Sequence, residues 1–272
     1  ALKSYKKALI VKPNYVEALY NLGSLLQILR QFDEAIKVYK KALSVKPDYF
    51  EVHNNLGVSF KEINQLDKAI ISYNNAISIK PDYVEAHTNI GNVLMELGHI
   101  DEAVESYQEA IILKPDYAQA HNNLGLTFLK LGQVNAAIKS YEKAIFNEPG
   151  YASAHHNLSA IKKYTKKDPQ IAQMESLIAS VDISQSDKTY LCFALAKANE
   201  DIGRQDEMFE FLHEGNRLRK EELDYSIESP ENQNIDVKNL FNSNHHSINK
   251  ILNQSTKIRP IFIVGMPRSG TS

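Results

Sequence analysis

The stretch VEAHTNIGNVLMELGHIDEAVESYQEAIILKPDY, residues 84–117, is one unit of a pattern that repeats along the first part of the chain. Its proline belongs to a series with a constant spacing of 34 residues, which comprises Pro13, Pro47, Pro81, Pro115 and Pro149. A fixed period of this length is typical of stacked helical hairpins, because one amphipathic hairpin can bury its apolar face only against its neighbours. The sequence therefore predicts an all-α array of helix pairs.

Small and aromatic residues recur with the same period, at positions where two helices approach closely. The sets are Gly23, Gly57, Gly91 and Gly125; Ala35, Ala69, Ala103 and Ala137; Tyr39, Tyr73, Tyr107 and Tyr141; and Ala42, Ala76, Ala110 and Ala144. This pattern resembles that of tetratricopeptide repeats (TPRs), in which the proline ends the second helix, helix B. The resemblance implies a right-handed superhelix, an α-solenoid.

The register of the repeats divides the chain. Complete repeats are expected at 16–49, 50–83, 84–117 and 118–151, with a partial repeat (helix B) at 1–15 and an extra helix A at 152–164. Beyond the strict period we expect a connecting helix in 165–188, starting at Asp168-Pro169, and a divergent TPR-like hairpin in 189–222. Residues 223–257 predict a linker. Because the sequence opens inside a repeat and lacks an initiating Met, we expect it to be a fragment.

Composition limits the possible partners. The chain has 272 residues, is 43% hydrophobic, and contains no apolar run approaching the roughly 20 residues that cross a membrane. Its net charge of −2 gives no general attraction to nucleic acid or to an anionic membrane. The single cysteine, Cys192, cannot form an internal disulfide and agrees with a reducing compartment. We therefore expect a cytoplasmic protein, although export stays open because the true N-terminus is expected to be missing.

A column of asparagines suggests a binding surface. It comprises Asn21, Asn55, Asn89, Asn123 and Asn157, each on the side of helix A opposite the apolar stripe. Asparagine is about 0.5 kcal/mol worse than alanine as a helix former, so we expect its replacement by alanine to leave stability equal or slightly higher. The units resemble the repeats of protein O-GlcNAc transferases, whose asparagine ladder holds a polypeptide by its backbone. The alternative is that duplication copied an idle residue.

Charge and histidine patterns refine this surface. Helix A begins with Glu17, Glu51, Glu85, Gln119 and Ser153, which favours a basic or neutral extended peptide over an acidic one. Histidines also recur, at His53, His87, His121 and His155. Successive helix A axes lie about 9–10 Å apart, too far for these side chains to share a metal, so we expect them to pack and expect no metal site.

The last residues, Ile258 to Ser272, carry a different signal. The run Ile261–Val264 predicts a buried strand, and the glycine spacing after it is that of a phosphate-binding loop. Thr271 stands where a nucleotide P-loop has its lysine, which argues against a kinase or a GTPase.

Residues 267–272 resemble the 5′-phosphosulfate loop of sulfotransferases that use 3′-phosphoadenosine 5′-phosphosulfate (PAPS). The resemblance implies that Arg268 is catalytic and stabilises charge on the leaving phosphate. It also implies a PAPS-binding set of Pro267, Arg268, Ser269, Gly270, Thr271 and Ser272. Most of such a domain would follow Ser272, so we expect this chain alone to be inactive and to bind no cofactor.

The order of repeats, hairpin, linker and loop resembles that of bacterial TPR sulfotransferases. This resemblance implies a C-terminal stub of an α/β P-loop-like domain and a parent enzyme that sulfates a protein or another macromolecule. Two alternatives stay open. One is a non-catalytic scaffold for protein interactions, and the other is the TPR region of a glycosyltransferase similar to the O-GlcNAc transferases.

Overall fold

The computed structural model describes residues 1–223, and this part of the chain is helical, with thirteen α-helices. The predicted all-α repeat fold is confirmed. The expected linker beyond Leu223, the terminal strand and the loop at 267–272 lie outside the described residues. Among the described helices, none is both long enough and apolar enough to cross a membrane.

The helices alternate between two roles in each repeat. The A helices are α2 (Val16–Ile28), α4 (Phe50–Glu62), α6 (Val84–Leu97), α8 (Ala118–Lys130) and α10 (Ala152–Ser159). The B helices are α1 (Leu2–Val11), α3 (Phe32–Val45), α5 (Leu66–Ile79), α7 (Ile100–Leu113) and α9 (Val134–Asn147). Three further helices follow, α11 (Pro169–Ile178), α12 (Gln185–Ile202) and α13 (Gln205–Glu222).

Each repeat is closed by a glycine that faces a tyrosine ring. A Cβ atom added to Gly23 would meet the ring of Tyr39 at 2.3 Å, and one added to Gly91 would meet Tyr107 at 2.6 Å. The same pairing joins Gly57 to Tyr73 and Gly125 to Tyr141. All four tyrosines are buried. Glycine is therefore required where helix A crosses the aromatic ring of its own helix B.

The loops after Pro47 and Pro81 are held by aromatic contacts between repeats. Tyr49 stacks on Tyr20 of the preceding helix A, with ring centroids 5.5 Å apart, and Tyr83 meets Phe50 edge-on at 4.9 Å. Lys80, which precedes the proline, lies 4.7 Å from the centroid of the Phe50 ring. These tyrosines therefore act as packing residues between repeats.

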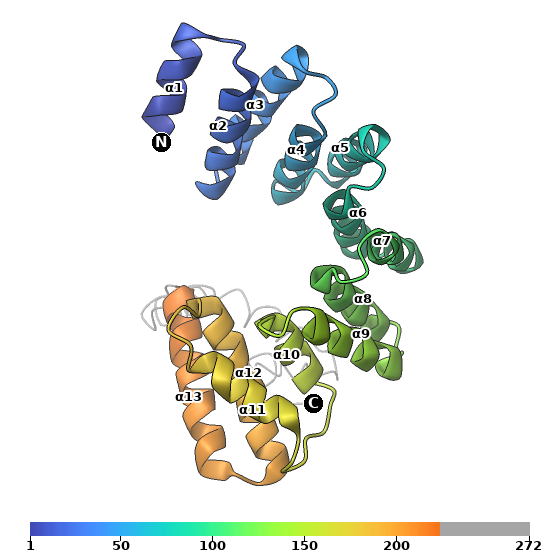
Figure 1. Cartoon of the computed structure of the whole chain (residues 1–272), viewed down its shortest axis with the longest axis vertical. Coiled ribbons are helices and arrows are strands. Elements are labelled where there is room, and N and C mark those ends of the chain that lie inside the picture. Colours follow the sequence, from blue (N-terminus) through green and yellow to red (C-terminus); the bar gives the residue numbers. More distant parts are fainter. Residues whose placement is uncertain (224–272) are drawn as a thin grey trace, which may run out of the picture. The chain divides into compact units, whose positions relative to one another are not determined.

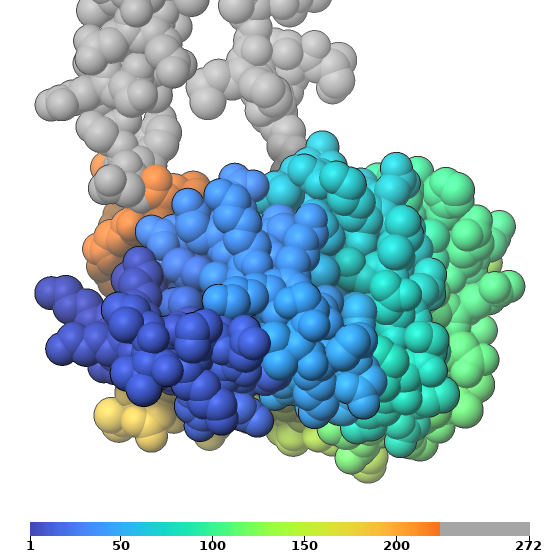
Figure 2. Space-filling model, turned by 90° about the horizontal axis from the view of Figure 1, so that it is seen from above, coloured from blue at the N-terminus to red at the C-terminus, as the bar shows by residue number. Residues whose placement is uncertain are grey.

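Successive repeats stack in one direction (Figures 1 and 2), as consecutive layers from the N-terminus onward. The A helices also contact each other directly, α2 with α4, α4 with α6 and α6 with α8, and no two successive B helices do so to the same extent. The side formed by the A helices is therefore the inner, shorter side of the stack. We call this surface the groove.

The end of the array differs from the prediction in two places. The extra helix A, expected at 152–164, ends at Ser159, and the hairpin expected from residue 189 begins at Gln185. A long-range bond explains the first difference, because the backbone N–H of Tyr164 donates to Asp201 Oδ2 of α12 at 3.1 Å. Ser184 explains the second, since its hydroxyl accepts from the N–H of Asp187 as an N-cap.

Helices α12 and α13 pack through a second close approach. A Cβ on Gly215 would lie 3.1 Å from the Cβ of Cys192, and Lys188 pairs with Glu214 at 3.0 Å. Burial raises the pKa of the Cys192 thiol to about 11, so it is protonated at neutral pH. A buried, protonated thiol of this kind is a packing residue and not a nucleophile.

Candidate functional site

The asparagine column lies along the groove, but its members are more embedded than the helical wheel suggests. Asn21, in the first complete repeat, is exposed, whereas the other four, Asn55, Asn89, Asn123 and Asn157, are half-buried. Each half-buried member sits on an A helix that contacts the preceding A helix, apart from Asn157, whose α10 packs on α9 and α12. The four half-buried asparagines therefore lie beside a neighbouring helix, where their side chains can form hydrogen bonds within the protein.

Three members of the column form hydrogen bonds between repeats. Asn89 Nδ2 donates to Asn54 Oδ1 of the preceding repeat at 3.0 Å, and Asn157 Nδ2 donates to Asn122 Oδ1 at the same distance. Asn123 Nδ2 donates to Asn92 Oδ1 at 2.8 Å. We call these three bonds the asparagine clasps. Removing one would cost about 0.5–1.5 kcal/mol, so the expectation that alanine leaves stability unchanged needs correction.

The clasps leave part of each amide free. An asparagine amide has two N–H donors and an oxygen with two lone pairs, and a clasp uses one donor. The oxygens of Asn89 and Asn157 make no hydrogen bond to another described side chain, and Asn123 Oδ1 accepts only a long bond of 3.4 Å from Asn122. The groove therefore presents fixed carbonyl oxygens at the period of the repeat, oriented by the clasps.

The first three repeats surround these amides with carboxylates. Glu17, Glu51 and Glu85 begin successive A helices, are exposed or half-buried, and form no ion pair within the described part of the chain. Glu62 and Glu96, near the other ends of α4 and α6, do not add to this charge, because they face Arg30 at 4.0 Å and Lys61 at 2.7 Å. In the next two repeats the first position is Gln119 and Ser153. The groove is therefore acidic over α2, α4 and α6 and close to neutral afterwards.

A pocket of about 270 Å³ opens in the groove where the third repeat meets the fourth. Its lining comprises Lys61, Asn92, Met95, Glu96, Tyr107, Asn123, Leu126 and Lys130. Lys61 and Glu96 form an ion pair at 2.7 Å. Two of the lining residues, Asn92 and Asn123, are also the partners of one asparagine clasp. The pocket is thus continuous with the column.

The recurring histidines join α4, α6, α8 and α10 to the loops before them. His53, His87 and His121 place Nε2 at 2.8, 2.9 and 2.9 Å from the carbonyl oxygens of Pro47, Pro81 and Pro115. A carbonyl can only accept, so Nε2 carries the proton. His155 repeats the contact with Pro149 at 3.0 Å. Among residues 1–223 no three potential ligands are grouped to hold a metal ion.

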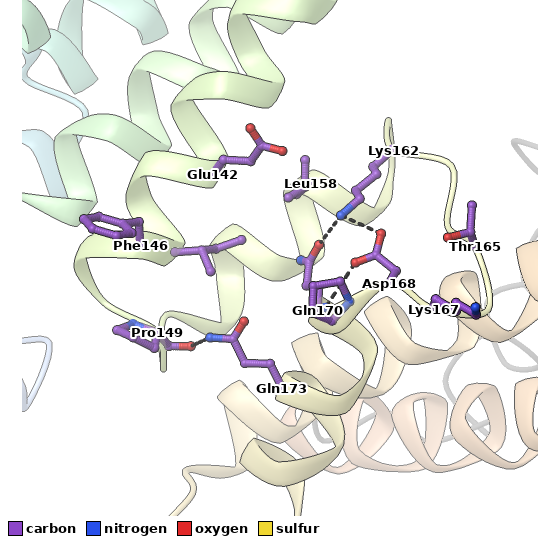
Figure 3. Close-up of a pocket in the computed structure, with 12 residues that line it drawn as sticks. Glu142, Phe146, Pro149, Leu158, Lys162, Thr165, Lys167, Asp168, Gln170 and Gln173 are labelled. Atoms are coloured by element: carbon purple, nitrogen blue, oxygen red, sulfur yellow. Dashed lines mark hydrogen bonds and ion pairs between the residues drawn. The ribbon is translucent and has the colours of Figure 1, made fainter.

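A larger cleft of about 600 Å³ lies between α9, α10 and α11 (Figure 3). Lys162 points at Asp168, 2.8 Å away, and donates to Gln170 Oε1 at 3.1 Å. Gln170 in turn bonds to Nδ1 of His155 at 3.0 Å, and Gln173 donates to the carbonyl of Pro149 at 3.4 Å. These groups satisfy one another and join the last repeat to α11. The polar groups of this cleft therefore have a structural role.

Sequence reasoning found the column but missed its partners. Asn54, Asn92 and Asn122 accept the three clasps. A signal was present for two of them, since the pair Asn54-Asn55 returns 68 residues later as Asn122-Asn123. Asn92 has no such counterpart and could not be found by periodicity. The predicted PAPS-binding residues, Pro267, Arg268, Ser269, Gly270, Thr271 and Ser272, lie outside the described residues.

The stacked helix pairs, the glycine and tyrosine contacts and the polar groove together define a helical-repeat scaffold. Family models for tetratricopeptide repeats match residues 4–37, 30–64, 59–98, 91–132 and 118–151. These matches are continuous from residue 4 to residue 151. The chain is therefore a tetratricopeptide-repeat protein, as the sequence pattern predicts.

The chain resembles a sequence relative and several solved structures. An uncharacterized protein of Aquifex aeolicus (strain VF5) is 31% identical over 112 residues, which are 41% of this chain and 15% of that protein. The chain thus spans a small part of that relative. The crystal structure of TTC0263, a TPR protein of Thermus thermophilus, is 18% identical with a TM-score of 0.55, over 66% of this chain and 98% of that one.

Two further solved structures have a TM-score of 0.50. YrrB, described as a TPR protein with an unusual peptide-binding site, is 16% identical and matches over 77% of this chain and 98% of its own. MamA from Desulfovibrio magneticus RS-1 is 22% identical over 55% of this chain and 85% of its own. At these identities the likeness concerns the fold alone.

Proposed function

We propose that the repeats bind an extended polypeptide in the groove. The observation that carries the proposal is the row of half-buried asparagine oxygens, which the clasps orient and which no described side chain occupies at Asn89 and Asn157. Such oxygens accept hydrogen bonds from peptide N–H groups regardless of sequence. YrrB, which shares the fold, is a peptide-binding protein by its description.

The dimensions suit an extended chain. Packed helices lie about 8–10 Å apart, and an extended peptide advances about 3.3 Å per residue. Each repeat therefore corresponds to about three peptide residues. The free carboxylates of Glu17, Glu51 and Glu85 favour lysine or arginine side chains on the part of the peptide that lies along the first three repeats.

Two substitutions separate binding from stability. Asn89→Ala removes an oxygen of the groove together with its clasp, whereas Asn54→Ala removes the same clasp and leaves Asn89 in place. Both variants are expected to lose about 1 kcal/mol of unfolding free energy. Asn89→Ala is expected to weaken binding of a lysine-rich extended peptide, measured by fluorescence anisotropy, more than Asn54→Ala, which keeps the Asn89 oxygen but no longer orients it. Equal weakening in both variants, or in neither, would mean that the column does not contact the peptide.

We also propose that the scaffold belongs to a PAPS-dependent sulfotransferase and presents a protein acceptor to it. The support is the sequence of residues 261–272, a short apolar run followed by Pro-Arg-Ser-Gly-Thr-Ser. PAPS would supply the sulfuryl group, the loop from Pro267 to Ser272 would hold the 5′-phosphosulfate, and the Arg268 guanidinium would stabilise charge on the departing phosphate. This loop speaks against the sugar-nucleotide alternative.

Calorimetry tests this assignment. A polypeptide that continues the reading frame past Ser272 is expected to bind PAPS, and its Arg268→Ala variant to turn over about 100-fold more slowly. Residues 1–272 alone are expected to bind PAPS weakly or not at all. Binding of a UDP-sugar in place of PAPS would favour the glycosyltransferase alternative, and binding of neither would favour a non-catalytic scaffold.

A further inference from the structure

The pocket between the third and fourth repeats has a floor with unused hydrogen-bond donors. Asn92 Oδ1 accepts two bonds of 2.8 Å, one from the hydroxyl of Tyr107 and one from Asn123 Nδ2. These two bonds use both lone pairs of the oxygen. They also fix the orientation of the amide, whose nitrogen donates to no other described side chain. The half-buried Asn92 is therefore a positioned N–H donor.

The rim of the same pocket carries a free positive charge. Lys61 and Lys130 line it together with Glu96. Lys61 is 2.7 Å from Glu96 and is neutralised by it, whereas Lys130 has no carboxylate partner among the described residues. The lining thus has two ammonium groups and one carboxylate, which leaves one positive charge. Met95 and Leu126 supply the apolar part of the wall.

No other repeat has this combination. The positions equivalent to Asn92 are Ser24, Val58 and Leu126, which offer no amide, and those equivalent to Lys130 are Ile28, Glu62 and Glu96. The pocket is therefore a single positively charged position in a groove whose first three repeats are acidic.

We propose that this pocket binds an aspartate or glutamate side chain of the groove peptide. The inference rests on the proposed peptide-binding function and adds a position to it. The carboxylate would accept from Asn92 Nδ2 and pair with Lys130, and its methylene groups would contact Met95 and Leu126. One negative charge matches the one free positive charge, and Glu96 disfavours a dianion such as phosphate. The preferred ligand is thus a basic segment followed or preceded by one acidic residue.

Matched peptides test the pocket. The probes are peptides of about ten residues with lysine at every third position and glutamate three residues beyond either end of the lysine series. In the controls glutamine replaces the glutamate. Of the two glutamate peptides, the one whose glutamate reaches the pocket is expected to bind wild-type protein about fivefold more tightly than its glutamine counterpart, as measured by anisotropy.

Two variants assign the preference to the pocket. Lys130→Gln is expected to reduce the preference to less than about twofold. Asn92→Asp keeps an oxygen for Tyr107 and Asn123 but replaces the donor by a second acceptor, and it is expected to reverse the preference. Lys139→Gln, on the exposed face of α9, makes the same change in net charge and is expected to leave the preference as in wild type.

The outcomes distinguish the two proposals. If the lysine peptides do not bind at all, both the groove proposal and this inference are wrong. If they bind without distinguishing glutamate from glutamine, the groove stands and the pocket inference is wrong. It is also wrong if the preference survives in both the Lys130→Gln and the Asn92→Asp proteins, because the carboxylate then binds elsewhere.

Discussion

At the scale of single residues, several side chains both stabilise the packing and orient polar groups in the groove. Asn89 joins two repeats through its nitrogen and offers its oxygen to the groove. Tyr107 fills the core against Gly91 and, through its hydroxyl, orients the amide of Asn92. A substitution at such a position changes both packing and recognition, so Asn89→Ala needs Asn54→Ala beside it as a control for the loss of the bond between repeats.

The glycine opposite each tyrosine gives a prediction about packing. Gly91→Ala gains about 1 kcal/mol of helix propensity but places a Cβ 2.6 Å from the Tyr107 ring, which the bond to Asn92 holds in place. Overpacking of this kind costs about 1–3 kcal/mol, so after the gain in helix propensity we expect a net loss of up to about 2 kcal/mol in urea unfolding.

Gly150→Ala is the control for this experiment. Its Cβ would make only an ordinary contact of 3.9 Å with Leu177, and the equivalent positions in other repeats are Asp48, Asp82 and Asp116. We expect a change of less than about 0.5 kcal/mol. A Gly91→Ala protein as stable as Gly150→Ala would show that the helices can separate at little cost.

His155 predicts a dependence of stability on pH. It is fully buried, donates to the Pro149 carbonyl and accepts from Gln170, so burial lowers the pKa of its imidazole. The unfolded chain takes up a proton near pH 6.5, before the folded protein does. Stability is therefore complete above about pH 6.5 and decreases as the pH falls from there toward the lowered pKa, by up to about 1.4 kcal/mol per pH unit.

Urea unfolding of wild type and of His155→Gln between about pH 5 and pH 7.5 measures this effect. The variant is expected to be less stable at neutral pH but to lose less stability on acidification. His156 contributes in the same direction, because burial and the charge of Arg219 lower the pKa of its imidazole. An unchanged pH slope in the variant would rule out His155 as the source.

At the scale of helices, the period of the sequence predicts most elements and fails where tertiary contacts decide. Five equally spaced prolines are sufficient to place α1 to α9, since each ends a helix B. The end of α10 at Ser159 depends on Tyr164 bonding to Asp201, 37 residues away, which no local pattern reveals. The acceptor Asn92 has no periodic counterpart and is hidden for the same reason, whereas Asn54 and Asn122 recur with their neighbours at a period of two repeats. A bond between repeats is visible in one repeat only as a polar residue on a helix.

The start of α11 predicts how one junction is stabilised. Asp168 caps the helix by accepting from the N–H of Gln170 at 3.1 Å and also pairs with Lys162. Asp168→Ala removes both interactions and is expected to cost about 1–2 kcal/mol in urea unfolding. Asp168→Asn retains a capping oxygen and removes only the charge, so it is expected to cost less than about 1 kcal/mol. Equal losses would place the stabilisation in the ion pair.

At the scale of the whole molecule, the junctions between repeats are not equivalent. Clasps of the same type, with the same 3.0 Å distance, follow the second and fourth repeats, at Asn54 to Asn89 and at Asn122 to Asn157. The first junction is different, because Gln27 Nε2 donates to the Asn55 carbonyl and to Ser59 Oγ. The third has a clasp to another position, Asn123 to Asn92, and also pairs Thr127 with Met95 Sδ at 3.3 Å. Clasps between the same pair of positions therefore recur at every second junction, and this is the alternation of the array.

This alternation makes two repeats, and not one, the unit in which the protein can be shortened. Excision of 50–117 would bring Gln27 opposite the Asn123 carbonyl and Thr127, which reproduce its present partners Asn55 and Ser59. Excision of 50–83 alone would leave Gln27 only the Asn89 carbonyl as an acceptor, because Val93 would take the place of Ser59. We expect the shorter protein to unfold at higher urea than the longer one, opposite to the usual gain with repeat number. If the longer protein unfolds at the higher urea concentration, a single repeat can be removed without regard to the kind of junction.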